Sequence, residues 1–269
     1  VERACTITRG GSGTSDFFGI NIFLRIPSRT AAEQFNDFVF LESHVETCSN
    51  QTGLKPNLIL VDFGAIGDVL EYVQDYNLAL ASTTSTEAPT VAPIAMPMAM
   101  PIAMPVPVAV NDTGVTEGSA PSAGPTTSPM PSTEDEKVCN GMNNLCNVRI
   151  NNMLFATAHN AHATSQTVPA SPNQDLSVTR ALEAGVRAIH VGMGLCRIEG
   201  TMTLSLVHGS CLNGYVDPVS FFTEINSFLA RNPTEVVVLL GEVDDNIGGE
   251  VTIDAIEEAM VSTFDVSAN

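Results

Sequence analysis

The sequence predicts an α/β protein in two globular parts, and three observations carry this prediction. Short apolar runs alternate with helix-like amphipathic stretches on both sides of the middle of the chain. Apolar residues make up 44 % of the 269 residues, which is enough to bury a core. Residues 83–137 are instead dominated by Thr, Ser, Pro, Ala and Met. We therefore expect residues 1–82 and 138–269 to fold, and residues 83–137 to link them.

The C-terminal part alternates strand patterns with helix patterns. Strands are expected over residues 153–158, 186–191, 203–207 and 235–240. Helices are expected over residues 176–184, 218–230 and 253–264, where apolar residues recur at helical spacing. Gly185 suits the C-cap of the first helix. The last strand is a nearly continuous Val/Leu run, which is typical of a strand buried on both faces. The alternation of strands and helices along the chain predicts that the strands pair in parallel.

The N-terminal part follows the same α/β pattern on a smaller scale. We expect strands within residues 17–26 and 57–63, and helices over residues 31–47 and 69–77. The glycines at 10–13 lack the spacing of a serine-hydrolase elbow and the GK[ST] signature of a phosphate loop. They are therefore interpreted as a turn.

The middle segment contains a stretch, residues 91–110, that has no charged residue and is long enough for a membrane span. Its prolines at 93, 97, 101, 105 and 107 exclude a regular helix. We expect a disordered, extended spacer with no transmembrane segment, whose Ser/Thr-rich flanks suit O-glycosylation. The alternative is an apolar strip that binds a partner.

The charge balance excludes some partners. Lys and Arg total 11 against 30 Asp and Glu, which gives a formal net charge of −19. Nucleic-acid binding requires clustered cations, and so does simple electrostatic docking on an anionic membrane. Neither is expected here.

Cysteine usage points to an oxidising compartment. Six cysteines are present, without a CxxC pair or zinc-finger spacing. The most local pairing joins Cys5 to Cys48, Cys139 to Cys146 and Cys196 to Cys211, and the alternative is six reduced thiols. Sequons begin at Asn50 and Asn111, so we expect a secreted or extracellular-surface protein. Because the sequence starts at Val1 rather than Met, we expect a mature product or a fragment.

Candidate acid–base groups lie at strand ends. His159, His190 and His208 each fall at or near the carboxyl end of an expected strand, where parallel α/β folds place active sites. Asp62 and Glu242 lie at the ends of two further apolar runs that are expected to form strands. For each group the structural alternative remains open: a satisfied surface histidine, or a carboxylate that fixes a loop.

A set of short motifs follows in order through the C-terminal part: Cys139-Asn-Gly, Ala156-Thr-Ala-His159-Asn160, Asn173-Gln174, Gly185-Val-Arg187, Val207-His208-Gly209 and Asn232-Pro-Thr-Glu235. This set resembles the first half of a PLC-like phosphodiesterase, a secreted relative of the phosphatidylinositol-specific phospholipase C X domain. In the N-terminal part, Cys5-Thr-Ile-Thr-Arg9 and Asn57-Leu-Ile-Leu-Val61-Asp62 resemble the end of the same domain. The resemblance implies a partial TIM-barrel-like fold, split into two pieces by the linker.

The order of the two pieces is inverted, and the middle of the domain, roughly 60–90 residues by the size of a TIM barrel, is absent. Two explanations compete. The chain is either a segment of a tandem array, with the tail of one domain and the head of the next, or a circular permutant that lost βα units. We favour the tandem segment.

The resemblance also implies a function in lipid metabolism, namely phosphoric diester hydrolysis of a phospholipid or a glycerophosphodiester-like molecule. His159 would act as general base and His208 as general acid, and Asp62 would orient a histidine if the two pieces close together. Asn160 and Glu242 match two calcium-side positions, which makes Ca²⁺ the one cofactor to consider.

The sequence departs from the family at two acidic positions, which are His190 and Gly192 here. Local positive charge would then come from Arg187, Arg197 or protonated His190. The alternative function is a catalytically impaired secreted module that binds lipid headgroups or surface glycans. A glycerophosphodiester phosphodiesterase ranks lower, because its His-Arg-Gly start is replaced by His159-Asn-Ala.

Overall fold

The computed structural model describes residues 5, 8–9, 18–24, 26–84, 138–244 and 247–264. The described residues within 1–85 and 137–269 form one compact unit. The expected turn at residues 10–13 lies outside the described residues, as does the expected linker from residue 85 onwards. Residues 83–84 belong to a helix instead.

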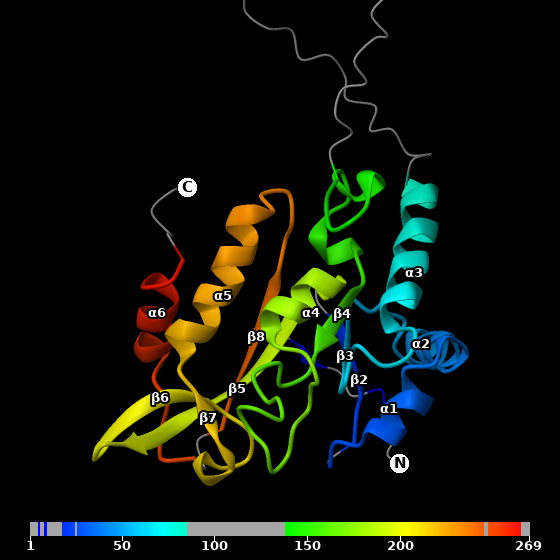
Figure 1. The fold of residues 1–269 in the computed structure, drawn as a ribbon. Coiled ribbons are helices and arrows are strands. Elements are labelled where there is room, and N and C mark those ends of the chain that lie inside the picture. The colour runs from blue at the N-terminus through cyan, green and yellow to red at the C-terminus, as the bar shows by residue number, and fades with distance from the viewer. Residues whose placement is uncertain are drawn as a thin grey trace, which may run out of the picture. The chain divides into compact units, whose positions relative to one another are not determined.

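The fold is built on parallel strands that come from both parts of the chain (Figure 1). In spatial order they are β2 (Phe18–Ile22), β3 (Leu58–Val61), β4 (Phe155–Ala158), β5 (Ala188–Ile198) and β8 (Val238–Val243). The α/β class with parallel pairing is therefore confirmed. The pairing of β3 with β4, Leu58 opposite Phe155, joins the N-terminal and C-terminal parts in one sheet.

Antiparallel strands extend this sheet. β1 (Thr8–Arg9) pairs with β2, β6 (Thr201–Val207) pairs with the second half of β5, and β7 (Tyr215–Val216) pairs with β6. The prediction for β5 was too short, because the strand continues past residue 191 into the hairpin with β6.

The sheet is open in the part of the chain that the structure describes. Its hydrogen-bonded path runs from β1 to β7, and β8 lies off this path and pairs with β5 alone. The prediction that this Val/Leu run is buried on both faces was wrong, since β8 is half-buried at its start and exposed from Gly241 to Val243. The physical reason is its position at the edge of the sheet, where no described strand covers its outer side.

Helices flank the strands: α1 (Arg29–Phe35), α2 (Phe38–Thr52), α3 (Val69–Thr84), α4 (Val178–Ala184), α5 (Pro218–Arg231) and α6 (Ile253–Val261). Short 3-10 turns occupy Asn143–Leu145, Ile150–Asn152 and Cys211–Asn213. Gly185 caps α4 with φ 111°, in the left-handed region that favours glycine.

Helix α5 shows why its sequence pattern was informative. Its buried side chains include Phe221, Phe222, Ile225 and Phe228, the apolar face predicted from helical spacing. They pack in one cluster with residues of α4, β5 and β6. Each such fully buried side chain stabilises the fold by roughly 1.5–3 kcal/mol relative to exposure.

The single helix expected over residues 31–47 is interrupted. Asp37 caps α2 by accepting a hydrogen bond from the backbone N–H of Phe40. The Asn36 amide donates to the carbonyl oxygens of Asp62, Phe63 and Ile66 at 3.1, 3.3 and 3.0 Å. The break therefore ties the α1–α2 corner to the loop that follows β3, and this loop carries Asp62.

Three disulfides join the predicted partners, Cys5–Cys48, Cys139–Cys146 and Cys196–Cys211. The most local pairing is thus confirmed, and the alternative of reduced thiols was wrong. Disulfides of this kind are compatible with an oxidising extracellular compartment. None of the described helices has the length and apolar character that crossing a membrane requires.

Candidate active site

The strand ends bring the predicted groups to one edge of the sheet. Asp62 follows β3, His159 follows β4, and Val61 pairs in register with Ala158, so the two side chains leave neighbouring strands at the same level. Glu242 of β8 lies opposite Gly192 of β5. This edge is the carboxyl end of the parallel strands, where α/β folds place ligands.

Asp62 and His159 form a buried pair. Oδ1 of Asp62 lies 2.8 Å from Nδ1 of His159, and the residues are 4 % and 8 % exposed. The amide of Asn173 donates to the same carboxylate oxygen at 2.8 Å. Since a carboxylate only accepts hydrogen bonds, this network assigns the proton of neutral His159 to Nδ1. The lone pair then resides on Nε2, which lies 3.2 Å from the side-chain amide nitrogen of Asn160.

Gln174 clamps the ends of the two strands together. Its amide group donates to the carbonyl oxygens of Val61 and His159 at 3.0 and 2.8 Å, and its amide oxygen accepts from the backbone N–H of Gly64 at 3.1 Å. Gln174 thereby fixes the spacing between the loops that carry Asp62 and His159. Asn173-Gln174 was one of the motifs noted in the sequence, but its two roles here were not predicted.

Phe23 covers the His159 ring. The two rings are stacked with centroids 3.6 Å apart and planes 10° apart. Sequence reasoning missed Phe23, because nothing distinguishes it from the other apolar residues that follow β2. Its effect is to limit the rotation of the imidazole and to exclude water from one of its faces.

Two residues next to this pair have backbone conformations that are uncommon outside glycine. Phe63 has φ 50° and Asn160 has φ 44°. Asn tolerates this region, whereas a bulky residue such as Phe is strained there. The N–H of Phe63 donates to the Asn173 carbonyl at 2.7 Å, which holds the turn in place. Strained residues of this kind concentrate at functional sites.

His190 lies beside His159, with ring centroids 5.1 Å apart. The backbone N–H of Asn160 donates to Nδ1 of His190 at 3.2 Å, which places the ring proton on Nε2, 3.5 Å from Oε2 of Glu242. The hydrogen bond with His190 holds the pKa of Glu242 below its usual range, and the partial burial of Glu242 opposes this effect.

Burial lowers the pKa of His159 below its ordinary 6.5. The hydrogen bond and the charge of Asp62 oppose this effect, and the neighbouring His190 and His208 add to it. A histidine in this setting is neutral at pH 7, which is the state a general base requires.

His208 follows β6, and its Nδ1 lies 3.0 Å from the carbonyl oxygen of Ser171. That carbonyl accepts the Nδ1 proton, so Nε2 is the nitrogen left for other contacts. The charge of His208 lowers the pKa of both His159 and His162, which places His208 within electrostatic range of both. If the two histidines flank a single phosphate, we expect their side chains to lie about 5–9 Å apart, and this separation stays a prediction.

His162 lies in the loop that follows β4, and it is one of the most buried side chains of the described chain. It is 2 % exposed, and neither ring nitrogen has a hydrogen-bond partner of standard geometry among the described residues. Burial lowers the pKa of His162 to about 3, and only a weaker backbone interaction with Val207 opposes this. His162 is therefore neutral throughout the physiological range.

The assignment of Asn160 and Glu242 as calcium-side residues stays a prediction. No three His, Cys, Asp or Glu side chains converge on a point within the described ranges. A Cβ at Gly192 would lie 2.6 Å from the carbonyl oxygen of Val207, so the backbone leaves no room for an acidic side chain there. Asn160 and Glu242 alone fall far short of the 6–8 oxygen ligands that Ca²⁺ prefers.

The two arginines expected to supply charge lie elsewhere. Arg187 pairs with Glu235 and donates to the carbonyl of Leu182, near the amino end of β5. Arg197 donates to Gly200 in the β5–β6 turn. Sequence reasoning missed a further cation, Arg29, whose guanidinium carbon lies 5.7 Å from the centroid of the Phe63 ring, next to Asp62 in sequence.

Arg29 forms an ion pair with Asp175 and its side chain is largely exposed. Asp175 directly follows Gln174, so the pair lies near the loops that hold Asp62 and His159. No sequence signal singled out Arg29, since an arginine at the start of a helix has no pattern of its own.

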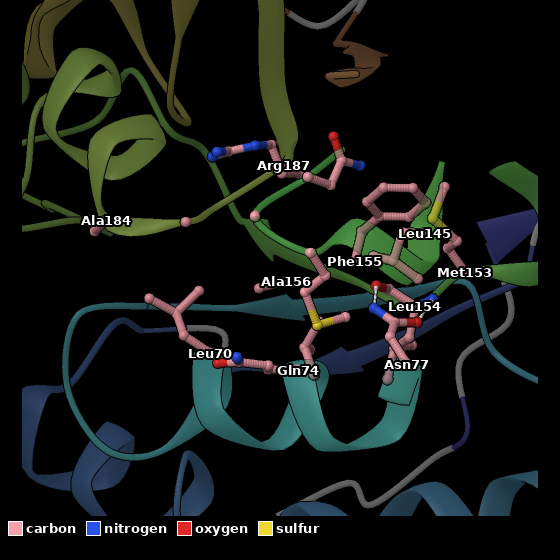
Figure 2. A pocket seen from close by; sticks show the side chains of 15 residues that line it. Leu70, Gln74, Asn77, Leu145, Met153, Leu154, Phe155, Ala156, Ala184 and Arg187 are labelled. Atoms are coloured by element: carbon pink, nitrogen blue, oxygen red, sulfur yellow. Dashed lines mark hydrogen bonds between the residues drawn. The ribbon is translucent and has the colours of Figure 1, made fainter. Parts of the chain in front are cut away.

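A separate cavity of about 160 Å³ opens at the amino end of β4 (Figure 2). Leu70, Gln74 and Asn77 of α3 line one side, and residues of β4 line another. The amide of Asn77 donates to the Leu154 carbonyl at 2.8 Å and accepts from the Leu154 N–H at 2.9 Å. Arg187 lines this cavity, whereas Asp62, His159, His208, Asn160 and Glu242 do not, so the cavity is separate from the pair of Asp62 and His159.

Comparisons with known proteins find relatives of the C-terminal part. Residues 145–267 match the model of the PI-PLC X 1 family, so this part of the chain is similar to a PI-PLC X domain. A PI-PLC X domain-containing protein 1 from Arthroderma benhamiae (strain ATCC MYA-4681 / CBS 112371) is 31 % identical over 114 residues. The match covers 42 % of this chain and 35 % of that relative, so the chain spans about a third of its length. No solved structure gives a significant match.

Proposed function

We propose that the chain carries a PLC-like phosphodiesterase site that cleaves a phosphoric diester by histidine acid–base catalysis. The observation that supports this most is the buried contact between Asp62 and His159 at the carboxyl end of the parallel strands. It unites a carboxylate, an oriented imidazole and a fixed tautomer, the combination that general-base catalysis uses.

In the proposed reaction, Nε2 of His159 takes the proton of the attacking water or substrate hydroxyl. Asp62 holds the ring and stabilises the imidazolium that forms. His208, protonated on Nε2, gives a proton to the leaving alkoxide as the phosphorus–oxygen bond breaks. The fixed Nδ1 contact of His208 with Ser171 directs Nε2 toward this role.

The substrate class is a phosphodiester, either a phospholipid or a glycerophosphodiester-like molecule. The developing negative charge on the phosphate needs nearby donors. Arg29 is the arginine placed near this edge, and it would have to exchange its contact with Asp175 for the phosphate. We propose no step through a metal ion, because the described residues do not assemble one.

We also propose that the chain is a partial TIM-barrel-like domain. The sheet is open beyond β8, which is the position at which the absent βα units would continue. The inverted order of the two parts remains compatible with a tandem-array segment or with a circular permutant. We retain the tandem segment and an extracellular location as proposals.

One observation favours a second function. The expected cations Arg187 and Arg197 contact Glu235 and the carbonyl oxygen of Gly200, away from the pair of Asp62 and His159. A site that holds the substrate without stabilising the transition state would act as a binding module for lipid headgroups or surface glycans.

One assay distinguishes phosphodiester hydrolysis from binding without turnover. The full chain is incubated with phosphatidylinositol-containing vesicles and with a soluble glycerophosphodiester, and both turnover and binding are measured. His159→Ala and His208→Ala should each lower the rate about 10²–10⁴-fold, the usual contribution of a positioned acid or base. His44→Gln serves as the control, because His44 lies on α2 beside Phe40 and away from the pair.

Binding without turnover by the unsubstituted chain would instead support the binding module. Turnover that survives both alanine substitutions would reject the histidine mechanism.

A further inference from the structure

The carboxylate of Asp62 has one oxygen that its contact with His159 leaves without a donor. Oδ1 accepts hydrogen bonds from Nδ1 of His159 and from the amide of Asn173, each at 2.8 Å. Oδ2 is buried and has no hydrogen-bond partner among the described residues. Burying an ionised oxygen without a donor is costly, and ordered water commonly satisfies buried polar atoms of this kind. A donor is therefore expected next to Oδ2.

A small cavity lies against Asp62 and provides space for such a donor. Its volume is about 10 Å³, which is about what a single water molecule needs. The cavity lies where the end of β2 meets the first turns of α1 (Figure 1). Apart from Asp62 and Ser28, its lining consists of apolar residues: Ile22, Phe23, Leu24, Ala31, Ala32 and Phe35.

Ser28 has the one side chain in the described lining of this cavity that can donate a hydrogen bond. It precedes α1 as the N-cap, and its Oγ accepts from the backbone N–H of Ala31 at 3.3 Å. A hydroxyl can accept and donate at the same time, so its proton remains available for a second contact. A water molecule in the cavity can accept this proton and donate one of its own to Oδ2 of Asp62.

We propose that one ordered water molecule occupies this cavity and links Ser28 to Asp62, which makes Ser28 a positioning residue for the Asp62–His159 pair. The water accepts the proton of the Ser28 hydroxyl and donates to Oδ2 of Asp62. Both carboxylate oxygens are then held by donors. The water site depends only on these contacts, whereas its effect on catalysis rests on the proposed phosphodiesterase function.

The link would act on His159 through the carboxylate. A hydrogen bond to Oδ2 favours the ionised form of Asp62 and limits rotation of the carboxylate about its own axis. Oδ1 then stays in line with the Nδ1 proton of His159 while Nε2 takes a proton from the attacking group. Ser28 touches neither the imidazole nor the substrate in this scheme, so its contribution is to orientation alone.

A high-resolution crystal structure of the full chain tests the water site directly. It should show one water within about 2.5–3.2 Å of both Oδ2 of Asp62 and Oγ of Ser28. In Ser28→Thr, which keeps the hydroxyl, the water should remain. In Ser28→Val, which has the shape of Thr without the hydroxyl, the water should be lost.

The proton on Nδ1 of His159 reports whether the water matters to the pair. In NMR spectra of the full chain, the signal of this proton should shift in Ser28→Val, and its exchange with solvent should become roughly 2–10-fold faster, as for the loss of one net hydrogen bond. Ser28→Thr should restore both the position and the exchange rate. A role limited to capping α1 would lower the stability of Ser28→Val and leave this signal in place.

Ser177→Val is the control for the loss of a helix cap. Ser177 is the N-cap of α4 and accepts from the backbone N–H of Arg180 at 3.4 Å, but it does not line the cavity. The control should therefore lose a cap of the same kind without changing the Nδ1 proton of His159.

An activity measurement separates this proposal from the proposed function. If the unsubstituted chain cleaves a phosphodiester, Ser28→Val should lower kcat roughly 2–10-fold with little change in KM, and Ser28→Thr should recover it. If the unsubstituted chain cleaves none, the proposed function fails, and the crystal structure and the His159 signal alone decide on the water link.

Three results would overturn the proposal. The first is a cavity without a water, or a Ser28 hydroxyl that contacts Asp62 directly. The second is an Nδ1 proton signal of His159 that is the same in Ser28→Val as in the unsubstituted chain. The third is a Ser177→Val control that changes this signal as much as Ser28→Val does.

Discussion

The carboxylate of Asp62 lies 2.8 Å from Nδ1 of His159, although the segment from 83 to 137 separates the two residues in sequence. The contact depends on the parallel pairing of β3 with β4, which places Val61 opposite Ala158. Each part of the chain therefore supplies one half of the pair. Neither half alone would orient the imidazole.

Asp62→Asn should remove most of the proposed phosphodiesterase activity while the fold persists. The amide can donate to Nδ1 of His159, which moves the ring proton to Nε2 and leaves no base facing the substrate. We expect a loss of about 10²–10⁴ in kcat, measured on phosphodiester substrates. Glu183→Gln, at an exposed position on α4, should change kcat little. A loss of less than threefold for Asp62→Asn would contradict the assigned role of Asp62.

Gln174→Leu should lower the free energy of unfolding. The substitution leaves the carbonyl oxygens of Val61 and His159 and the N–H of Gly64 without their partner. A buried group that loses its hydrogen bond costs about 1–3 kcal/mol, so we expect a loss of about 2–5 kcal/mol in denaturant unfolding. Gln166→Leu, at an exposed position in the same loop, should stay within about 0.5 kcal/mol. Equal stability of the two variants would show that the hydrogen bonds of Gln174 do not stabilise the fold.

Stability should fall in acid because His162 is buried as a neutral ring. Its pKa is about 3 in the folded chain against 6.5 for an ordinary histidine, so between these values the unfolded chain binds the extra proton. The free energy of unfolding should therefore decrease by about 1.4 kcal/mol for each pH unit below 6.5. In His162→Leu this contribution disappears, and the slope of stability against pH should be smaller by that amount. Identical slopes for the two proteins would contradict the burial of His162.

Calcium should leave the stability of the chain unchanged. A ligand that binds only the folded state raises the thermal midpoint with concentration. Because Gly192 leaves no space for an acidic ligand, we expect the same midpoint in CaCl₂ and in EDTA at matched ionic strength. Gly192→Asp should destabilise the fold by about 1–3 kcal/mol through its contact with Val207, without creating calcium dependence. A midpoint that rises steadily with calcium would reveal a site that the described residues do not show.

Much of the fold could be predicted because it depends on local patterns. Apolar runs located β3 and β4, and the spacing of Phe221, Phe222, Ile225 and Phe228 predicted α5. The break between α1 and α2 could not be predicted in this way. It depends on Asn36, whose amide reaches three carbonyls in a loop about 30 residues away.

The residues of the candidate site could be predicted from the sequence, but the contacts that their side chains make could not. Strand ends identified His159, His190 and Asp62, because parallel strands share one functional edge. Nδ1 of His190 accepts a hydrogen bond from the backbone N–H of Asn160, and no sequence pattern records such a contact. The positions of Arg187 and Arg29 likewise depend on partners that are distant in sequence, Glu235 and Asp175.

The most direct test of the shared site is the titration of His159, followed by NMR in the full chain and in Asp62→Asn. Burial lowers the pKa of His159, whereas the hydrogen bond and the charge of Asp62 raise it. We therefore predict that His159 titrates below 6.5 in the unsubstituted chain and at a still lower pH in Asp62→Asn. The same titration midpoint in both proteins would contradict the contact between the two parts of the chain.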